Sequence, residues 1–517
     1  MSTEAEHQPL ADTFNFAQHL LTLNTKRANK IAYIDDTGSL DYGELNTRVQ
    51  RFASSLLTLG VHREERVLLI MNDCFDLPIA FLGAIYAGII PVPVNTLLTP
   101  DDYTYLLENT RAQAVVISDP LIPKLTNALN MAQHDVKNII VSNPSEKNSH
   151  EFITMSELTA DSVTPVEAAK TAPNDQGFWL YSSGSTGRPK GTVHTQANPY
   201  WTAKLYGSQI LALTENDICF SAAKLFFAYG LGNAMTFPLS VGATTILMAE
   251  RPTPDAVFQR LTEHQATVFF GAPTGYAGML ASPSLPTKNQ VSLRLASSAG
   301  EALPAEIGQR FSAHYGIDLV DGIGSTEMLH IYLSNRPGQI RYGTTGWPVP
   351  GYQVELRNKE GQAVACGEAG DLYVNGPSSA IMYWANRTKS QETFFGEWLK
   401  TGDTYVQNDD GTFTYSGRSD DMIKVSGIYV SPFEVEATLI EHPAVFEAAV
   451  IGEADKEDLI KTKAFVVLKP GQSSNETELK AFVKERLAPY KYPRSIEFVT
   501  ELPKTATGKI QRFKLRK

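Results

Sequence analysis

The chain has 517 residues, of which 43% are hydrophobic and 20% are charged. A single hydrophobic core stops growing at roughly 250 to 300 residues, so this length predicts more than one domain. The formal net charge of −11 offers no general attraction for nucleic acid or for an anionic membrane, so any anionic substrate needs a local binding site. The three cysteines, Cys74, Cys219 and Cys366, lie far apart without metal-ligand spacing, which indicates a reducing compartment and no disulfide framework.

The N-terminal residues 1–15 are polar and acidic, and they lack the basic start and apolar centre of a signal peptide. We therefore expect a cytoplasmic protein. Residues 77–94, LPIAFLGAIYAGIIPVPV, form an uncharged run close to a membrane span of about 20 residues. Because prolines and glycines interrupt this run, we predict a helix followed by a strand, and no membrane span.

Patterns typical of buried strands alternate with helical patterns through the first two thirds of the chain. Such runs begin at Arg66, Ala114, Asn138, Thr244 and Thr267. This alternation predicts an α/β fold, with parallel or mixed sheets flanked by helices in a large N-terminal domain.

The pattern of predicted secondary structure changes after about residue 346. Short strand patterns are separated there by Gly, Asn and Asp, and NDDG at 408–411 is a hairpin signal. These features predict a small, mainly antiparallel β-rich subdomain over about 346–419. A compact α+β segment follows, in which SPFE at 431–434 has the form of a capping box with proline at the first helical position. We expect a large domain over 1–419 and a small, mobile C-terminal domain over 420–517.

The segment YSSGSTGRPKGTVHT at 181–195 follows an apolar strand pattern at 177–181. A run so rich in Gly, Ser and Thr predicts a loop, because glycine loses backbone entropy in helices and sheets. Glycines, hydroxyl groups and the ammonium of Lys190 are typical of a phosphate-binding loop. The spacing differs from the Walker pattern, since Gly187 is followed by Arg188, Pro189 and Lys190 and then by Gly191. A flexible surface linker is the alternative.

The C-terminal stretch 501–517, ELPKTATGKIQRFKLRK, holds six basic residues and the single acid Glu501. A solvated basic tail is one interpretation. The other is that Lys509, placed after a glycine turn, presents its ammonium to an anion.

Five motifs resemble those of the adenylate-forming enzymes, and they occur in the order of that superfamily. They lie at 181–191, 322–327 (GIGSTE), 401–403 (TGD), 417–427 (GRSDDMIKVSG) and 503–509 (PKTATGK). The superfamily includes acyl-CoA synthetases, adenylation domains of peptide synthetases and firefly luciferase. The stretches LFFAYGLGN at 225–233 and GSTEMLHIYLSN at 324–335 resemble the benzoate-CoA ligases in particular. Serine stands at 182, 183 and 185 where many members carry threonine, so the hydroxyl groups are retained.

This resemblance implies an ATP-dependent ligase that joins an aryl acid, benzoate or a simply substituted benzoate, to CoA through an acyl-adenylate. ATP, Mg²⁺ and CoA are the implied cofactors and co-substrates. The residues implied at the nucleotide are Ser182, Ser183, Gly184, Ser185, Thr186 and Lys190 at the β- and γ-phosphates, Thr326 at the α-phosphate, Ala299, Gly300, Glu301, Asp321 and Gly322 beside adenine, and Asp403 with Arg418 at the ribose. Glu327 is the implied Mg²⁺ ligand, and Lys509 bridges the carboxylate and the α-phosphate.

The same resemblance assigns the acyl pocket, the CoA site and a hinge. The acyl pocket comprises Phe227, Ala228, Tyr229, Gly324, His330 and Ile331, the CoA site comprises Lys424, Ser426 and Gly427, and the hinge is Asp420. Two aromatic rings around a small alanine suit a flat, short acid better than a long alkyl chain. We expect His330 to donate a hydrogen bond to the bound acid, with a buried core histidine as the alternative.

Each assignment has a plainer structural interpretation. Glu327 could be an acid in the first turn of a helix, and Asp403 with Arg418 could be a solvated pair on a hairpin. At the level of function, the alternatives are an aryl-acid adenylating enzyme that loads a carrier-protein thiol, and a nucleotide-binding homologue without catalysis. Whether the chain forms a homodimer is left open.

Overall fold

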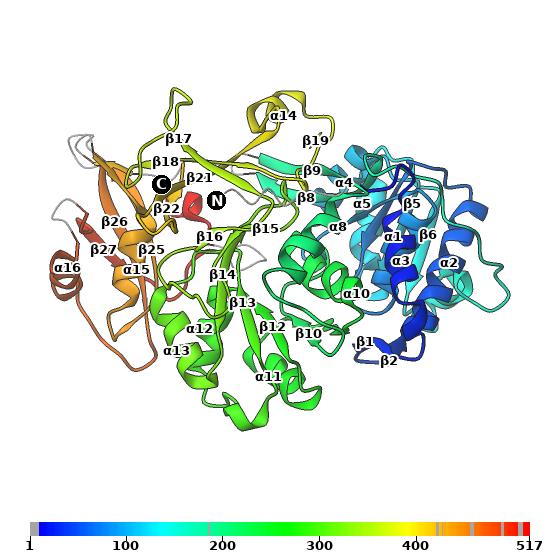
Figure 1. Ribbon diagram of the computed structural model, residues 1–517, viewed down its shortest axis with the longest axis horizontal. Coiled ribbons are helices and arrows are strands. Elements are labelled where there is room, and N and C mark those ends of the chain that lie inside the picture. The colour runs from blue at the N-terminus through cyan, green and yellow to red at the C-terminus, as the bar shows by residue number, and fades with distance from the viewer. Residues whose placement is uncertain are drawn as a thin grey trace.

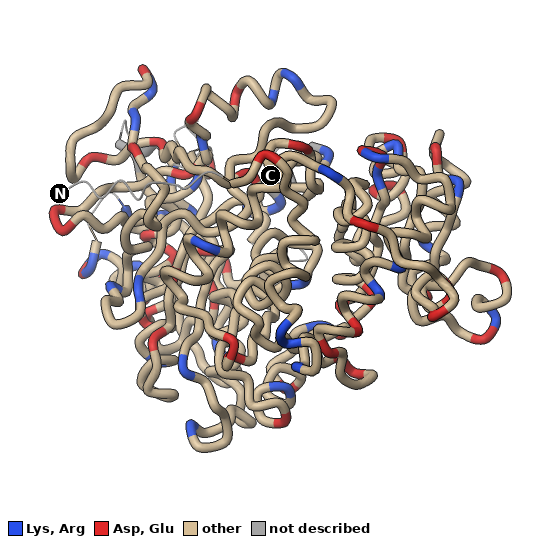
Figure 2. Tube along the Cα trace, turned by 45° about the vertical axis from the view of Figure 1, so that its right-hand side comes forward, with Lys and Arg blue, Asp and Glu red and all other residues tan. Residues whose placement is uncertain are grey.

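The structure is a computed structural model, and it describes residues 10–184, 187–419, 423–425, 428–454, 460–487, 491–504 and 510–516. Along this part of the trace, basic and acidic residues are interspersed over all regions of the molecule (Figure 2). Within it, none of the helices is long and apolar enough to cross a membrane.

A five-stranded parallel sheet lies in the N-terminal part of the chain, in the strand order β4-β3-β5-β6-β7. Its strands are β3 (Arg66–Ile70), β4 (Ile90–Pro93), β5 (Ala114–Ser118), β6 (Asn138–Ser142) and β7 (Ile153–Thr154). The predicted strands at Arg66, Ala114 and Asn138 are confirmed. Residues 77–94 form a helix followed by a strand, α3 (Asp76–Tyr86) and β4, as expected from the interrupted apolar run.

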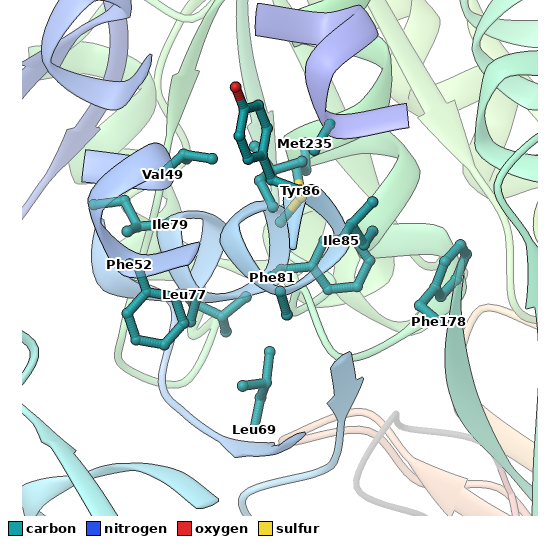
Figure 3. Packing of buried hydrophobic residues seen from close by; sticks show 14 of the residues in the cluster. Val49, Phe52, Leu69, Leu77, Ile79, Phe81, Ile85, Tyr86, Phe178 and Met235 are labelled. Atoms are coloured by element: carbon teal, nitrogen blue, oxygen red, sulfur yellow. The ribbon is translucent and has the colours of Figure 1, made fainter. Parts of the chain in front are cut away.

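Helices cover both faces of this sheet, which explains why β5 is buried along its whole length. One apolar cluster joins the sheet to α1 (Phe16–Leu23), α2 (Tyr42–Thr58) and α3, and Figure 3 shows Phe52, Leu69 and Phe81 packed within it. Another cluster joins the opposite face to α4 (Pro100–Thr110) and α5 (Ile122–Met131). Burial from two sides makes the strands uniformly apolar rather than alternating.

A nine-stranded sheet occupies the centre of the molecule, in the order β16-β15-β14-β13-β12-β10-β11-β1-β2 (Figure 1). Its strands are β1 (Ile31–Asp35), β2 (Gly38–Asp41), β10 (Ile218–Ser221), β11 (Thr244–Ile246), β12 (Val268–Gly271), β13 (Leu295–Ser298), β14 (Leu319–Gly324), β15 (Ile331–Ser334) and β16 (Trp347–Pro348). The six strands from β14 to β1 in this spatial order run parallel to one another. At the two edges of the sheet the pairing is antiparallel, between β1 and β2, between β14 and β15, and between β15 and β16. The predicted strands at Thr244 and Thr267 are thereby confirmed.

Further helices lie along this part of the chain. They are α6 (Asn148–Glu151), α7 (Met155–Leu158), α8 (Asn198–Thr202), α9 (Ala228–Leu231), α10 (Phe237–Val241), α11 (Pro254–Glu263), α12 (Pro273–Ala281) and α13 (Ala305–Tyr315). Two π-helical segments, η3 (Ala203–Ser208) and η4 (Gly232–Thr236), extend α8 and α9.

The segment that we predicted as a phosphate loop is largely a β-hairpin. β8 (Gln176–Gly184) continues through Ser182, and β9 (Gly187–Thr195) carries Lys190 directly opposite Ser182. The prediction of a loop is therefore wrong for these residues. The two polar segments pair with each other, so their backbone N–H and C=O groups are satisfied without an apolar environment.

The pairing around β9 also explains how a strand of this hairpin accommodates Pro189. β19 (Met382–Tyr383) pairs with β9 at Thr192 and Val193, beyond the proline. Only β8 flanks Pro189 among the described strands, so the missing N–H does not interrupt a central ladder.

The β-rich region follows residue 346 as predicted. It contains β17 (Gln353–Arg357), β18 (Ala369–Asn375), β20 (Phe394–Phe395), β21 (Trp398–Gln407) and β22 (Phe413–Arg418), with the helix α14 (Arg387–Thr393) beside them. All of its strand pairs are antiparallel, and residues 408–411 connect β21 to β22 as the hairpin signal indicated.

The last part of the chain has α+β composition. It contains β23 (Ile423–Val425), β24 (Ile428–Val430), α15 (Pro432–Ile440), β25 (Val445–Ala454), β26 (Ile460–Leu468), α16 (Glu476–Lys484) and β27 (Ser495–Phe498). Two buried clusters consist only of residues from Ile423 onward. Ser431 caps α15 by accepting from the N–H of Glu434, whose carboxylate binds Lys491 at 2.6 Å. The expected hinge, Asp420, lies outside the described residues.

Candidate active site

Three predicted site residues converge where the β8–β9 hairpin meets the end of β14. The hydroxyl of Ser182 donates to Oε1 of Glu327 at 3.2 Å, and the ammonium of Lys190 lies 3.9 Å from the same oxygen. The side chains of Lys190 and Glu327 are 17% and 14% exposed, so the pair is largely shielded from bulk water. Burial lowers the pKa of Lys190, and the neighbouring Glu327 carboxylate counters this effect.

Glu327 lies in a turn and not in a helix. Residues 325–330 connect β14 to β15, and Leu329 has a positive φ of 65° there. The Ser325 hydroxyl accepts from the N–H of Met328 at 3.1 Å, and the N–H of Ala380 donates to the Glu327 carbonyl at 2.7 Å. The interpretation of Glu327 as a first-turn helix acid is therefore wrong.

Two residues of this cluster were missed in the sequence. Tyr383 donates its hydroxyl to Oε1 of Glu327 at 2.7 Å and accepts from the ammonium of Lys190 at 3.3 Å. His194 places Nε2 2.8 Å from the carbonyl oxygen of Thr326, and its buried ring stacks on Phe178. Burial lowers the pKa of His194 to about 4, so the ring is neutral at pH 7. A lone tyrosine or histidine in a strand has no periodic signal that would have found either residue.

Asp403 and Arg418 face each other across the β21–β22 hairpin. Arg418 Nη1 donates to Asp403 Oδ1 at 3.0 Å and to the Thr401 carbonyl at 3.2 Å. The Asp403 side chain is only 10% exposed, whereas that of Arg418 is 42% exposed. The alternative of a fully solvated pair therefore does not hold for the carboxylate.

The residues assigned to adenine lie at the carboxyl end of β13 and beside it on the adjacent parallel strand β14. Ala299, Gly300 and Glu301 follow β13, and Ser298 of β13 lies opposite Asp321 of β14. Gly300 has a φ of +94°, which suits glycine. Burial raises the pKa of Asp321 well above its ordinary value. Ligands of parallel α/β sheets bind at this edge, which is consistent with the assignment.

The residues assigned to the acyl group are also neighbours. The rings of Tyr229 and His330 lie 5.4 Å apart, and the Tyr229 hydroxyl donates to the Ser297 carbonyl at 3.1 Å. Phe227 precedes the short helix α9, which begins with Ala228. Close packing leaves no room for a side chain at Gly324, where an added Cβ would lie 2.4 Å from the His330 carbonyl oxygen. Ile331 follows His330 at the start of β15.

His330 is buried, and burial lowers its pKa to about 3. Its Nε2 lies 3.3 Å from the Tyr229 carbonyl oxygen, so the proton of the neutral ring belongs on Nε2. Nδ1 is buried and has no hydrogen-bond partner among the described residues. In this tautomer Nδ1 can accept a hydrogen bond but cannot donate one, contrary to the donor role that we expected.

Several predicted site residues lie outside the described residues. These are Ser185, Thr186, Asp420, Ser426, Gly427 and Lys509. For Ser183, Gly184 and Lys424 the structure describes the backbone, as parts of β8 and β23. In the described part of the chain, no group of three or more His, Cys, Asp or Glu side chains could hold a metal ion by itself.

Ser182 and Lys190 of the hairpin, Glu327 beside them, and Asp403 come from three of the motifs that resemble the adenylate-forming enzymes. The chain belongs to the AMP-binding enzyme family, which it matches over residues 22–384, and it matches the C-terminal domain of AMP-binding enzymes over residues 434–509. The resemblance recognised in the sequence is thereby confirmed.

Individual relatives are similar over their whole length. A benzoate-CoA ligase of Thauera aromatica is 53% identical over 514 residues, which cover 98% of this chain and 96% of the relative. The crystal structure of a benzoate CoA ligase from Burkholderia xenovorans LB400 is 59% identical and superposes with a TM-score of 0.92, covering 98% of this chain and all of that one. The anthranilate CoA ligase AuaEII, solved in complex with anthranoyl-AMP, is 40% identical with a TM-score of 0.93 over 98% and 97% of the two chains.

Proposed function

We propose that this chain is an ATP-dependent aryl-acid:CoA ligase whose acid is benzoate or a simply substituted benzoate. The observation that carries this proposal is the convergence of Ser182, Lys190 and Glu327, from segments far apart in the sequence, into one shielded cluster. The names of the two relatives that are 53% and 59% identical over their full length support benzoate as the acid.

In the first half-reaction, a carboxylate oxygen of the acid attacks the α-phosphorus of ATP. The bond from that phosphorus to the bridging oxygen breaks, and pyrophosphate leaves with the electron pair. Lys190 and the hydroxyl groups of Ser182, Ser183, Ser185 and Thr186, with the backbone of Gly184, bind the β- and γ-phosphates, and Thr326 binds the α-phosphate. Preorganised donors at this point stabilise the charge that grows on the leaving pyrophosphate.

Glu327 fits a Mg²⁺ ligand. Among the described residues, the contacts that Glu327 makes with Ser182, Lys190 and Tyr383 all involve Oε1, which leaves Oε2 available to a cation. Mg²⁺ is bound in such sites by one or two carboxylates together with substrate phosphates, and a single protein carboxylate is therefore sufficient. When bound, Mg²⁺ neutralises charge on the phosphate oxygens. Glu327 would hold and orient this metal, and Lys190 would move from the carboxylate to the phosphates.

The nucleoside is bound between β13, β14 and the β21–β22 hairpin. Ala299, Gly300 and Glu301 cover one side of adenine, and Asp321 and Gly322 cover the other. Asp403 accepts hydrogen bonds from both ribose hydroxyls, and Arg418 holds the carboxylate in place.

The acyl group is bound between Phe227, Ala228, Tyr229 and His330, with Gly324 and Ile331 beside them. The fixed Tyr229 and His330 rings give the pocket a flat aromatic wall, which favours an aryl acid over a long alkyl acid.

In the second half-reaction, the sulfur of CoA attacks the acyl carbonyl carbon, and AMP leaves with the bonding electrons. The roles proposed here follow from the family motifs. Lys509 serves adenylation, a rotation at Asp420 removes it, and the strand with Lys424, Ser426 and Gly427 then lines the pantetheine path. On this basis we retain residues 1–419 and 420–517 as the two domains, and the cytoplasm as the location.

The test is pyrophosphate release measured over a panel of aryl and alkyl acids with ATP, Mg²⁺ and CoA present. We expect release with benzoate, together with AMP and benzoyl-CoA in equal amounts. Adenylate formed without discharge to free CoA would favour the carrier-protein alternative. No release with any acid would favour the non-catalytic alternative, and turnover of alkyl acids alone would exclude the aryl assignment.

A further inference from the structure

Tyr383 adds a fourth side chain to the cluster of Ser182, Lys190 and Glu327, from a separate part of the chain. It lies on the two-residue strand β19, which pairs with β9, the second strand of the β8–β9 hairpin. The residue is only 3% exposed, and its ring packs against Phe394 with the ring centroids 5.4 Å apart. The Ser390 hydroxyl also accepts from its N–H at 3.0 Å. Tyr383 is therefore held from several sides, and its hydroxyl has a fixed position.

The hydroxyl of Tyr383 stands between the two charges. It accepts from Lys190 at 3.3 Å and donates to Glu327 Oε1 at 2.7 Å, while Lys190 and Oε1 are 3.9 Å apart. A direct ammonium–carboxylate hydrogen bond is shorter, about 2.7 to 2.9 Å. The ammonium also lies 4.4 Å from the centre of the tyrosine ring. The lysine is thus held near the acid without a tight ion pair.

From this geometry we infer that Tyr383 is a positioning residue for the metal carboxylate. Its hydroxyl anchors Oε1 of Glu327, turns Oε2 toward the cation site, and keeps Lys190 loosely held so that phosphate can draw the ammonium away. This inference rests on the proposed roles of Glu327 and Lys190.

Removing only the hydroxyl should change the site in a defined way. In Tyr383→Phe, the ring and its packing remain, but Oε1 loses its shortest hydrogen bond. Lys190 and Glu327 can then close to a direct pair, which the incoming metal and phosphates must break. Loss of a group that orients a metal ligand typically weakens metal binding by about 10- to 100-fold, and we expect that range here.

Tyr42 provides a matched control. It is also 3% exposed, and its hydroxyl donates to a protein oxygen, the Ala243 carbonyl, at the same distance of 2.7 Å. It lies at the start of α2, among residues that have no part in the proposed site. Tyr42→Phe therefore removes an equivalent buried hydrogen bond and reports the structural cost alone.

The experiment measures Mn²⁺ binding to the full-length protein by electron paramagnetic resonance, with the unreactive nucleotide α,β-methylene-ATP. Tyr383→Phe should weaken Mn²⁺ binding about 10- to 100-fold, and Tyr42→Phe should match the wild type. Nucleotide binding in EDTA should change little in either variant. Excess Mg²⁺ should restore much of the pyrophosphate release of Tyr383→Phe with benzoate.

Wild-type Mn²⁺ affinity in Tyr383→Phe would overturn the inference, as would an equal loss of nucleotide affinity with and without metal. Equal weakening of Mn²⁺ binding in Tyr42→Phe would reduce the effect to general destabilisation and would also overturn it. Failure of the proposed function looks different, because the wild type would then release no pyrophosphate with any aryl acid. The Mn²⁺ measurement needs no acid and is independent of that outcome.

Discussion

Replacing Asp403 by asparagine should lower kcat/KM for ATP while leaving the β21–β22 hairpin folded. The carboxylate is largely buried and is bound by Arg418 through one oxygen, Oδ1, at 3.0 Å. In the proposed site it also accepts hydrogen bonds from the two ribose hydroxyls. Asparagine keeps one accepting oxygen and the size of the side chain, so the change acts on charge and on accepting capacity.

The expected magnitude follows from the hydrogen bonds that change. A hydrogen bond to a charged group contributes about 1.5 to 3 kcal/mol, and one between neutral groups about 0.5 to 1.5 kcal/mol. For two ribose hydroxyls the difference amounts to about 2 to 3 kcal/mol. Because about 1.4 kcal/mol corresponds to a factor of ten, kcat/KM for ATP should fall about 30- to 150-fold.

The assay compares ATP with 2′-deoxy-ATP in pyrophosphate release at saturating benzoate. In the wild type, loss of the 2′-hydroxyl should lower kcat/KM by about 10- to 150-fold, the scale of one hydrogen bond to a charged acceptor. In Asp403→Asn, the penalty for 2′-deoxy-ATP should shrink to about 2- to 10-fold, the scale of a hydrogen bond between neutral groups, because the accepting side chain has lost its charge. An additive effect, with the same penalty in both proteins, would refute the contact with the ribose.

The pair Asp217 and Arg294 supplies the control. Its side chains are 4% and 40% exposed, close to the 10% and 42% of Asp403 and Arg418, and Arg294 binds Asp217 at 2.6 Å. Asp217→Asn should lower thermal stability at least as much as Asp403→Asn without changing the ratio of ATP to 2′-deoxy-ATP. If both variants lose ATP use equally, the reasoning from the Asp403 site fails.

Three other predictions address the two half-reactions, the acyl pocket and the effect of pH. Lys509→Ala should reduce adenylation by about 10²- to 10³-fold or more and spare thioester formation from presynthesised benzoyl-adenylate. Asp420→Pro should do the reverse, because proline restrains the backbone rotation. Equal damage to both steps in well-folded protein would exclude a two-conformation mechanism. Ala228→Phe should exclude benzoate by overfilling the pocket, and a smaller residue at Tyr229 should widen acceptance of substituted rings; unchanged benzoate kinetics in Ala228→Phe would mean that the wall lies elsewhere. Burial lowers the pKa of His330 from 6.5 to about 3. As the pH falls below about 6.5, the imidazole is therefore protonated in the unfolded chain and stays neutral in the folded one. The free energy of unfolding should then decrease toward acid by up to about 1.4 kcal/mol per pH unit. The midpoint of urea denaturation should therefore fall less steeply between about pH 6.5 and pH 5 in His330→Phe than in the wild type, and identical slopes would contradict a neutral buried His330.

The sequence determined the strands of the parallel sheets and the family of the protein. Runs such as RVLLI and AVVIS are apolar on both faces, so burial between two helical layers was readable from local composition alone. The five motifs were recognisable because each lies in a short segment of fixed spacing, and this local order places Asp403 and Arg418 on a hairpin without any knowledge of contacts.

The local conformation of two of these segments was decided by partners elsewhere in the chain. Residues 181–190 have a loop composition, but the two halves of the segment pair as β8 and β9 and satisfy each other's backbone groups. Residues 325–330 have no helical hydrogen-bonding pattern, since Ser325 and Ala380 bind their backbone. Tertiary contacts override the intrinsic conformational propensity of the residues at such places.

Only the tertiary structure revealed the residues that support the site. Tyr383 meets Glu327 across 56 residues of sequence and Lys190 across 193, and His194 reaches Thr326 across 132. Tyr383 lies in a two-residue strand and His194 near the end of β9, and no periodicity marks either side chain. Their roles depend on the pairing of β19 with β9 and on the end of β14 lying beside that hairpin, which are properties of the whole fold and not of any segment.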